Sequence, residues 1–303
     1  MFATLLAVLV ALVLGHLAHS LAVAVRNYAW FDGWLAWLDA KFPEDGFWRG
    51  RYGIVLALLP PLLAVGLFQA ALDGPMYGLP ALLFGVAALF YAWGPRDLDH
   101  DVEAIVDAPD DGSRRAAAAR LWPSARQVPN VDGPAAVEAV FNNALRRWFG
   151  VLFWFLLLGP FGALLYRLAA IAAEEAAPRL PAGTAEGART LLVALDWPVA
   201  QLMTLSMALV GNFDVVASAW KRNGGDAFAL DTGFLAAAGR ASVRSEIADE
   251  AEEYTESGVP ASSALLAELG PLPELRDAMS LVWRILLVWL AVLALFVVAG
   301  WVS

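Results

Sequence analysis

The chain has 303 residues, of which 60% are hydrophobic and 17% are charged, with a mean hydropathy of +0.61. An average soluble domain has about 45–50% apolar and about 25% charged residues. This composition therefore excludes an ordinary soluble enzyme and indicates a helical membrane protein in contact with lipids. The net charge of -10 argues against a nucleic acid as partner. The chain has no cysteine, which excludes disulfides, Fe–S clusters and thiolate zinc sites, and we expect no haem.

The apolar segments predict an all-α, polytopic integral membrane protein with five or six transmembrane helices. The sixth candidate segment carries the polar residues Asp196, Gln201, Asn212 and Asp214. It could span the membrane, re-enter it or lie in its interface, and the sequence leaves these alternatives open. The predicted spans are residues 2–25, 54–72, 76–93, 148–173, 281–302 and the doubtful 190–219.

Basic residues predict the orientation of these helices, because cytoplasmic loops carry an excess of Lys and Arg. Four basic residues lie between the first and second spans and seven between the third and fourth, but the turn at 73–75 has none. We therefore expect a multi-pass protein of a bacterial inner membrane with its N-terminus outside. If residues 190–219 span, the C-terminus is also outside.

Two cytoplasmic segments, 94–147 and 220–280, are expected to form amphipathic helices that belong with the spans to a single membrane domain, 1–303. Ser113 is a candidate cap for a helix over 114–122, and Gly133-Pro134 is a typical helix start. The acidic run within 246–256 predicts a solvated helix face, with docking of a cytoplasmic protein as the alternative. We expect a second short helix over 261–269.

An acidic cluster follows the third predicted span. Carboxylates four residues apart share a helix face and could hold Mg²⁺. The alternative is that acids in a first helical turn offset the helix dipole. The cluster consists of Asp97, Asp99, Asp101 and Glu103.

Charged residues inside the apolar segments are expected to be paired, because isolated charges there are costly. Arg167 is a candidate partner for Asp196, and Asp214 could pair with Arg146, Arg147 or Lys221. The sequence has no P-loop, dinucleotide-binding motif, nucleophile elbow or zinc-protease helix. No catalytic residue can therefore be assigned from motifs of this kind.

Six segments are spread in order over nearly the whole chain: WFDGWLAW, YGIVLALLPPLL, GPRDLDHDVEA, RRWFGVLFWFLLLGPFGALLYRL, LDWPVAQLMTLSMALVGNFD and WRILLVWLAVLAL. Together they resemble the AmpE family of inner-membrane proteins, which is linked to β-lactamase induction. AmpE belongs to a wider superfamily with CobD/CbiB, a membrane enzyme that joins an aminopropanol unit to adenosylcobyric acid in cobalamin biosynthesis.

Two local patterns are similar to those of CobD/CbiB enzymes. Residues 137–143, VEAVFNN, resemble V-E-S-V-A-E-N, and Glu138 and Asn143 keep the family residue types. Where the enzymes have a second glutamate and an aspartate, this chain has Asn142 and Arg146. Residues 159–167 match G-P-x-G-A-x-x-Y-R.

Other family patterns are absent. Residues 168–175 have nothing like V-N-T-L-D-S-M, and the L-G-D-P, H-P-V and H-P-S-P-N-A-G segments have no counterpart. These departures argue against the same ligase reaction, and they are compatible with a retained small-molecule pocket.

Three functions are consistent with these observations. The resemblance to AmpE implies a signalling modulator that binds a small molecule without turnover, with a pocket lined by Glu138, Asn143, Arg167, Asp196, Asn212 and Asp214. The first alternative is a CobD/CbiB-like enzyme of amide-forming or related transfer chemistry, with Mg²⁺ as a cofactor. The second is a membrane scaffold that docks a cytoplasmic partner through the acidic helix 246–256. We favour the modulator, and whether the chain is an enzyme stays open.

Overall fold

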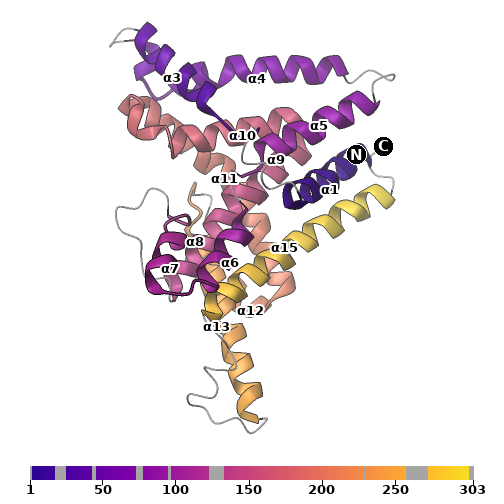
Figure 1. The fold of residues 1–303 in the computed structure, drawn as a ribbon. Helices are drawn as coiled ribbons and strands as arrows, with labels where there is room; N and C mark the ends of the chain where they lie inside the picture. The colour runs from indigo at the N-terminus through magenta and orange to yellow at the C-terminus, as the bar shows by residue number, and fades with distance from the viewer. Residues whose placement is uncertain are drawn as a thin grey trace. The chain divides into compact units, whose positions relative to one another are not determined.

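The computed structural model describes residues 2–17, 25–42, 46–72, 78–94, 97–122, 133–227, 229–256 and 272–299. These residues form helices and turns without a strand, so the predicted all-α fold is confirmed for this part of the chain (Figure 1). Two predictions lie outside the described residues: the helix 261–269 and residues 18–24 of the first span.

Three described helices are long and apolar enough to cross a membrane: α4 (Gly53–Leu72), α11 (Ala182–Val210) and α15 (Pro273–Val298). Shorter apolar helices include Leu5–Leu14 within α1 (Phe2–Leu17), α5 (Gly78–Ala92) and α10 (Pro160–Ala173). The chain is therefore a membrane protein by the length and composition of its helices.

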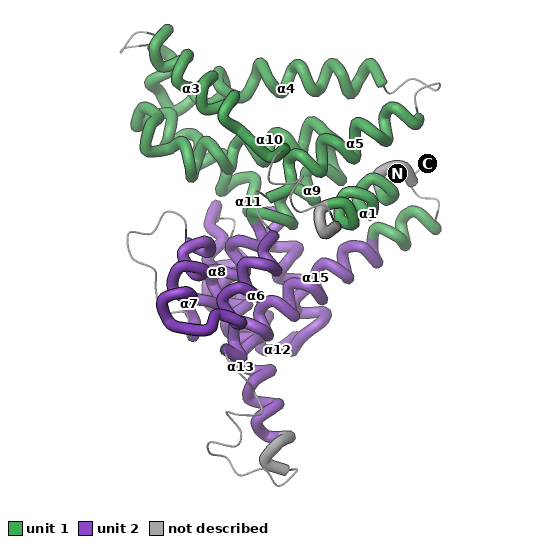
Figure 2. Tube along the Cα trace, in the orientation of Figure 1, with its two compact units in different colours: residues 1–95, 146–196, 293–303 green, residues 96–145, 197–292 purple. Residues whose placement is uncertain are grey.

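The chain divides into two compact units (Figure 2). Unit 1 comprises residues 1–95, 146–196 and 293–303, and unit 2 comprises residues 96–145 and 197–292.

In unit 1, α10 packs against α4, α5 and α9 (Gly150–Leu158), and α1 packs against α5. Helix α3 (Ala29–Lys41) contacts α4 and buries Phe31, Leu35 and Leu38. Short helical turns lie at Phe47–Arg49 and Ala177–Arg179. The core of unit 1 is thus formed around α10, most of whose residues are buried.

In unit 2, α13 (Gly233–Glu256) packs against α8 (Pro134–Ala144) and α12 (Phe213–Arg222). Helix α6 (Leu98–Val106) packs against α7 (Asp111–Ala118) and α8. The predicted acidic helix is the end of α13, and within it Glu246 accepts two hydrogen bonds from Arg284 of α15, at 2.9 and 2.7 Å. Docking of a partner there stays a prediction.

The pair Gly159-Pro160, which by its sequence should bend a helix, forms a complete break between α9 and α10. Gly159 has φ +66°, a conformation that favours glycine, and Pro160 is the first residue of α10. The side chain of Gln69 in α4 satisfies backbone groups on both sides of the break: it donates to the Leu158 carbonyl at 3.2 Å and accepts from the Phe161 N–H at 3.0 Å. Such compensation is needed where no water can replace the lost helical bonds.

Two expected helix boundaries differ in the structure. The segment 190–219 is not one helix, because α11 begins at Ala182 and ends at Val210, and α12 begins after Asn212, whose side chain accepts from the Val215 N–H. The helix expected over 114–122 is α7, and its cap is Asp110 rather than Ser113, because the Asp110 carboxylate accepts from both the N–H and the hydroxyl of Ser113. A carboxylate three residues before an N–H is well placed to cap it.

Candidate functional site

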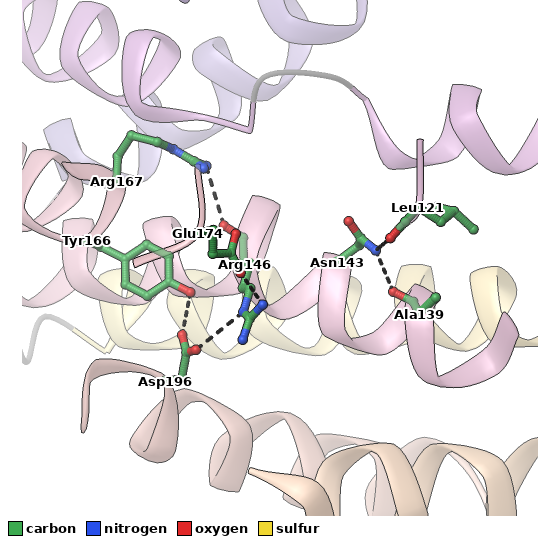
Figure 3. A network of polar contacts seen from close by, with 8 residues as sticks. All are labelled: Leu121, Ala139, Asn143, Arg146, Tyr166, Arg167, Glu174 and Asp196. Atoms are coloured by element: carbon green, nitrogen blue, oxygen red, sulfur yellow. Dashed lines mark hydrogen bonds and ion pairs between the residues drawn. The ribbon is translucent and has the colours of Figure 1, made fainter. Parts of the chain in front are cut away.

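A network of polar side chains lies in unit 1, with Arg146 at its centre (Figure 3). Arg146 belongs to a π-helical turn, Leu145–Phe149, and such turns occur often at functional sites. Its guanidinium forms a close ion pair with Glu174 and lies 3.6 Å from Oδ2 of Asp196. Burial acts to lower the pKa of Arg146, but the charges of Glu174 and Asp196 outweigh this effect and raise the pKa above its ordinary value.

Asp196 is a deeply buried member of the network, with 1% of its surface exposed. The hydroxyl of Tyr166, itself fully buried, donates a 2.5 Å hydrogen bond to its Oδ1 atom. The carboxylate is therefore held between a hydroxyl from α10 and a guanidinium from the π-helical turn, an arrangement that offsets the cost of burying its charge.

Arg167 follows Tyr166 on α10 and is also buried. Its Nε donates to the Ala92 carbonyl at 2.6 Å, and its Nη2 donates to the Arg146 carbonyl at 3.4 Å. The side chain thus ties the end of α5 to the π-helical turn. Asp196 pairs with Arg146 instead of with Arg167, which corrects the expectation from the sequence.

Two glycines allow these helices to approach closely. A Cβ atom on Gly150 would lie 2.0 Å from the ring of Tyr166, and one on Gly162 would lie 2.0 Å from the Trp154 carbonyl oxygen. The structure thus accounts for both glycines of the G-P-x-G-A-x-x-Y-R pattern, Gly159 by its positive φ and Gly162 by this close approach. The last two residues of the pattern, Tyr166 and Arg167, belong to the network.

A polar cavity of about 340 Å³ adjoins Arg167 in unit 1. Its walls come from the start of α3 and the end of α10, two segments far apart in the chain. The lining residues are Arg26, Asn27, Tyr28, Ala29, Asp32, Arg167, Ile171 and Glu175.

The residues expected to line one ligand pocket are distributed between the two units. Arg167 and Asp196 lie in unit 1 and are connected through Arg146. In unit 2, Glu138 pairs with Arg240, and Asn143 donates to the carbonyls of Leu121 and Ala139 at 2.9 and 2.8 Å (Figure 3). Asn212 caps α12, and Asp214 is exposed on its first turn with no ion pair to a described residue.

Three of the four acids proposed for Mg²⁺ make separate contacts, and the fourth, Glu103, is exposed. Asp97 caps α6 by accepting from the Asp99 N–H, and Asp99 also accepts from the Trp283 indole at 3.1 Å. Asp101 is buried and lies 3.6 Å from Arg120. Within the described ranges no three His, Cys, Asp or Glu side chains are placed to hold a metal ion. These four acids therefore do not form a metal centre in the part of the chain that the structure describes, and we derive no step through one.

Sequence reasoning did not select Tyr166, Arg146 or Glu174 as site residues. Tyr166 was visible only as a family match, Arg146 as a family departure and a candidate partner of Asp214, and Glu174 carried no motif signal. The cavity residue Arg26 gave no signal beyond its basic charge. These groups come together through helix packing, which a single sequence does not reveal.

Comparison with known proteins identifies the family. A sequence model of the CobD/Cbib protein family matches residues 4–244. The cobalamin biosynthesis protein CobD of Chromobacterium violaceum is 35% identical over 128 residues, which cover 40% of this chain and 38% of that protein. No solved structure matches. The family match spans most of the chain and includes the whole network around Arg146, whereas nothing in these comparisons supports an AmpE-specific assignment: the chain belongs to the CobD/CbiB family.

Proposed function

We propose that this protein is a membrane enzyme of cobalamin biosynthesis that forms an amide bond, with its reactive centre in unit 1. One observation carries the proposal: the family motif residues Tyr166 and Arg167 lie in one polar network with Arg146, Glu174 and Asp196, beside a polar cavity. Charged groups among apolar helices are costly, and they tend to mark functional sites.

The chemistry of the network suits this reaction class. Amide formation joins an amine nitrogen to an activated carboxyl carbon, the bond from that carbon to its leaving oxygen breaks, and the amine loses a proton. The Asp196 carboxylate is oriented by Tyr166 and is the candidate general base. The Arg146 guanidinium is the candidate group to stabilise negative charge that develops on the carboxyl oxygen.

Arg146 itself favours a second candidate function. It stands where the family enzymes carry an aspartate, and a guanidinium is always charged and accepts no proton. The loss of an acid at the centre of the network is consistent with a protein that binds a small molecule without turnover, as the resemblance to AmpE implies. A signalling role would then depend on ligand binding alone.

A turnover assay separates the two candidates. The detergent-purified protein is incubated with adenosylcobyric acid, an aminopropanol substrate, a nucleoside triphosphate and Mg²⁺, and the corrinoid amide is detected by mass spectrometry. We expect turnover that Asp196→Asn reduces by at least about 100-fold, since general base catalysis contributes about 10²–10⁴-fold. The matched control is Arg189→Lys, a change at an exposed residue of α11. Retention of a substrate without turnover would favour the second candidate, and neither binding nor turnover would contradict both.

A further inference from the structure

Two buried arginines line the polar cavity of unit 1. Arg26 is 9% exposed and Arg167 is 5% exposed, so both guanidinium groups are largely removed from water. Arg26 donates to the carbonyls of Phe90 and Gly94 at 3.0 and 2.8 Å, and Arg167 donates to that of Ala92 at 2.6 Å. Both side chains therefore meet the carbonyl end of α5 and the residues that follow it.

The carbonyls of Ala92 and Arg146 satisfy donors of Arg167, but they leave its formal charge in place. Arg167 has no carboxylate within ion-pair distance among the described residues, and a buried charge is normally paired. Neither acid that lines the cavity forms an ion pair with Arg167. Asp32 is 2.8 Å from Arg179, and Glu175 is exposed and forms no ion pair with a described residue.

The start of α3 also lines the cavity. Tyr28, Ala29 and Asp32 belong to the start of α3, where the partial charge of a helix is positive. The side chain of Asn27 uses its Oδ1 atom to accept from the Ala29 N–H, so its amide nitrogen remains a potential donor. Two guanidinium groups, a helix start and an amide thus line a cavity of about 340 Å³, together with the carboxylates of Asp32 and Glu175.

We infer that this cavity binds a small oxyanion, a phosphate or carboxylate group, through Arg26 and Arg167, with Glu175 at its edge opposing the bound charge. Arginine suits this role because its planar fork matches the oxygens of both groups. The inference rests on the proposed function in placing a ligand beside Arg167, but it requires no turnover. Failure of the amide-forming assay would leave anion binding intact.

Calorimetric titration of the lipid-free protein in a non-ionic detergent with inorganic phosphate tests the inference. Arg167→Gln is expected to weaken binding by more than about tenfold, since charged hydrogen bonds contribute about 1.5–3 kcal/mol. Because that variant also loses contacts to two backbone carbonyls, the decisive variant is Glu175→Gln. It removes a like charge and is expected to strengthen phosphate binding by about three- to tenfold. The matched control is Glu186→Gln, an exposed glutamate on α11 that does not line the cavity.

A second arm identifies the source of the oxyanion. The protein is reconstituted in nanodiscs with phosphatidic acid or with phosphatidylcholine, released, and examined by native mass spectrometry for retained lipid. Phosphate binding that Glu175→Gln strengthens supports the site with a soluble ligand. Selective retention of phosphatidic acid that Glu175→Gln increases supports the same site with a lipid headgroup. Phosphate binding that is absent or unaffected by Glu175→Gln, together with no selective lipid retention, would overturn the inference.

Discussion

The hydroxyl of Tyr166 donates a 2.5 Å hydrogen bond to Oδ1 of Asp196, thirty residues further along the chain. Both side chains are buried, and Gly150 leaves the space in which the tyrosine ring lies. This contact joins α10 to α11 and orients the carboxylate that faces Arg146. It therefore connects the stability of unit 1 with the chemistry proposed for it.

Tyr166→Phe should destabilise the protein. The change removes the hydroxyl donor of a buried carboxylate while keeping the ring, and a hydrogen bond to a charged group contributes about 1.5–3 kcal/mol. Thermal unfolding in detergent, followed by circular dichroism, measures the effect. Tyr52→Phe is the control, because Tyr52 is 69% exposed. Equal unfolding temperatures for the two variants would contradict the assigned role of the hydroxyl.

Gly150→Ala should destabilise the protein by overpacking. The added Cβ would lie 2.0 Å from the Tyr166 ring, and overpacking of this kind costs about 1–3 kcal/mol. Gly33→Ala is a matched change within a helix where a Cβ meets nothing within 4 Å, and it should stabilise by about 0.5–1 kcal/mol through helix propensity. The unfolding temperature should fall for Gly150→Ala and rise for Gly33→Ala. A fall for both variants would contradict the difference in available space at the two glycines.

Gln69→Leu should destabilise the backbone at the break between α9 and α10. It leaves the Leu158 carbonyl and the Phe161 N–H without their side-chain partner, at a cost of about 1–3 kcal/mol for each group. Hydrogen exchange should then increase at Phe161, and the unfolding temperature should fall. Leu67→Met, at a 70% exposed position of α4, serves as the control. Unchanged exchange at Phe161 would be evidence against the role of Gln69.

The raised pKa of Glu175 predicts that the stability of the protein depends on pH. Desolvation, the largest cause, raises the pKa of this carboxyl above its ordinary value of 4.5, and the charge of Arg167 lowers it less. A folded pKa above the unfolded one means that this group's contribution is fully present below about pH 4.5 and is lost as pH rises through the folded pKa. Relative to the wild type, Glu175→Gln should therefore gain stability as pH increases over that window.

Unfolding temperatures of the wild type and of Glu175→Gln, measured between pH 4 and pH 8, check this expectation. The two curves should meet at the acid end and separate at higher pH, with the variant more stable. A variant that is less stable at neutral pH would mean that the ionised carboxylate is stabilising, which contradicts the raised pKa.

The sequence alone determined the class of the protein and most of its helices. Composition and apolar segments specify an all-α membrane protein, and Gly159-Pro160 and Gly133-Pro134 mark a helix break and a helix start that the structure confirms. These features are local, because lipid leaves few backbone structures available. Glycine permits backbone conformations that other residues rarely adopt, and proline restricts the backbone where it stands. The AmpE resemblance rested on six segments along the chain, and the comparisons support only the CobD/CbiB family.

Only the tertiary structure decided which charges meet. Asp196 had a plausible partner in Arg167, but helix packing places Tyr166 and Arg146 beside it and turns Arg167 toward backbone carbonyls and the cavity. The role of Gln69 at the break was likewise invisible in the sequence. The physical reason is the same in both cases: periodicity tells which residues share a helix face, whereas the partner of a buried polar group depends on which faces of distant helices pack together.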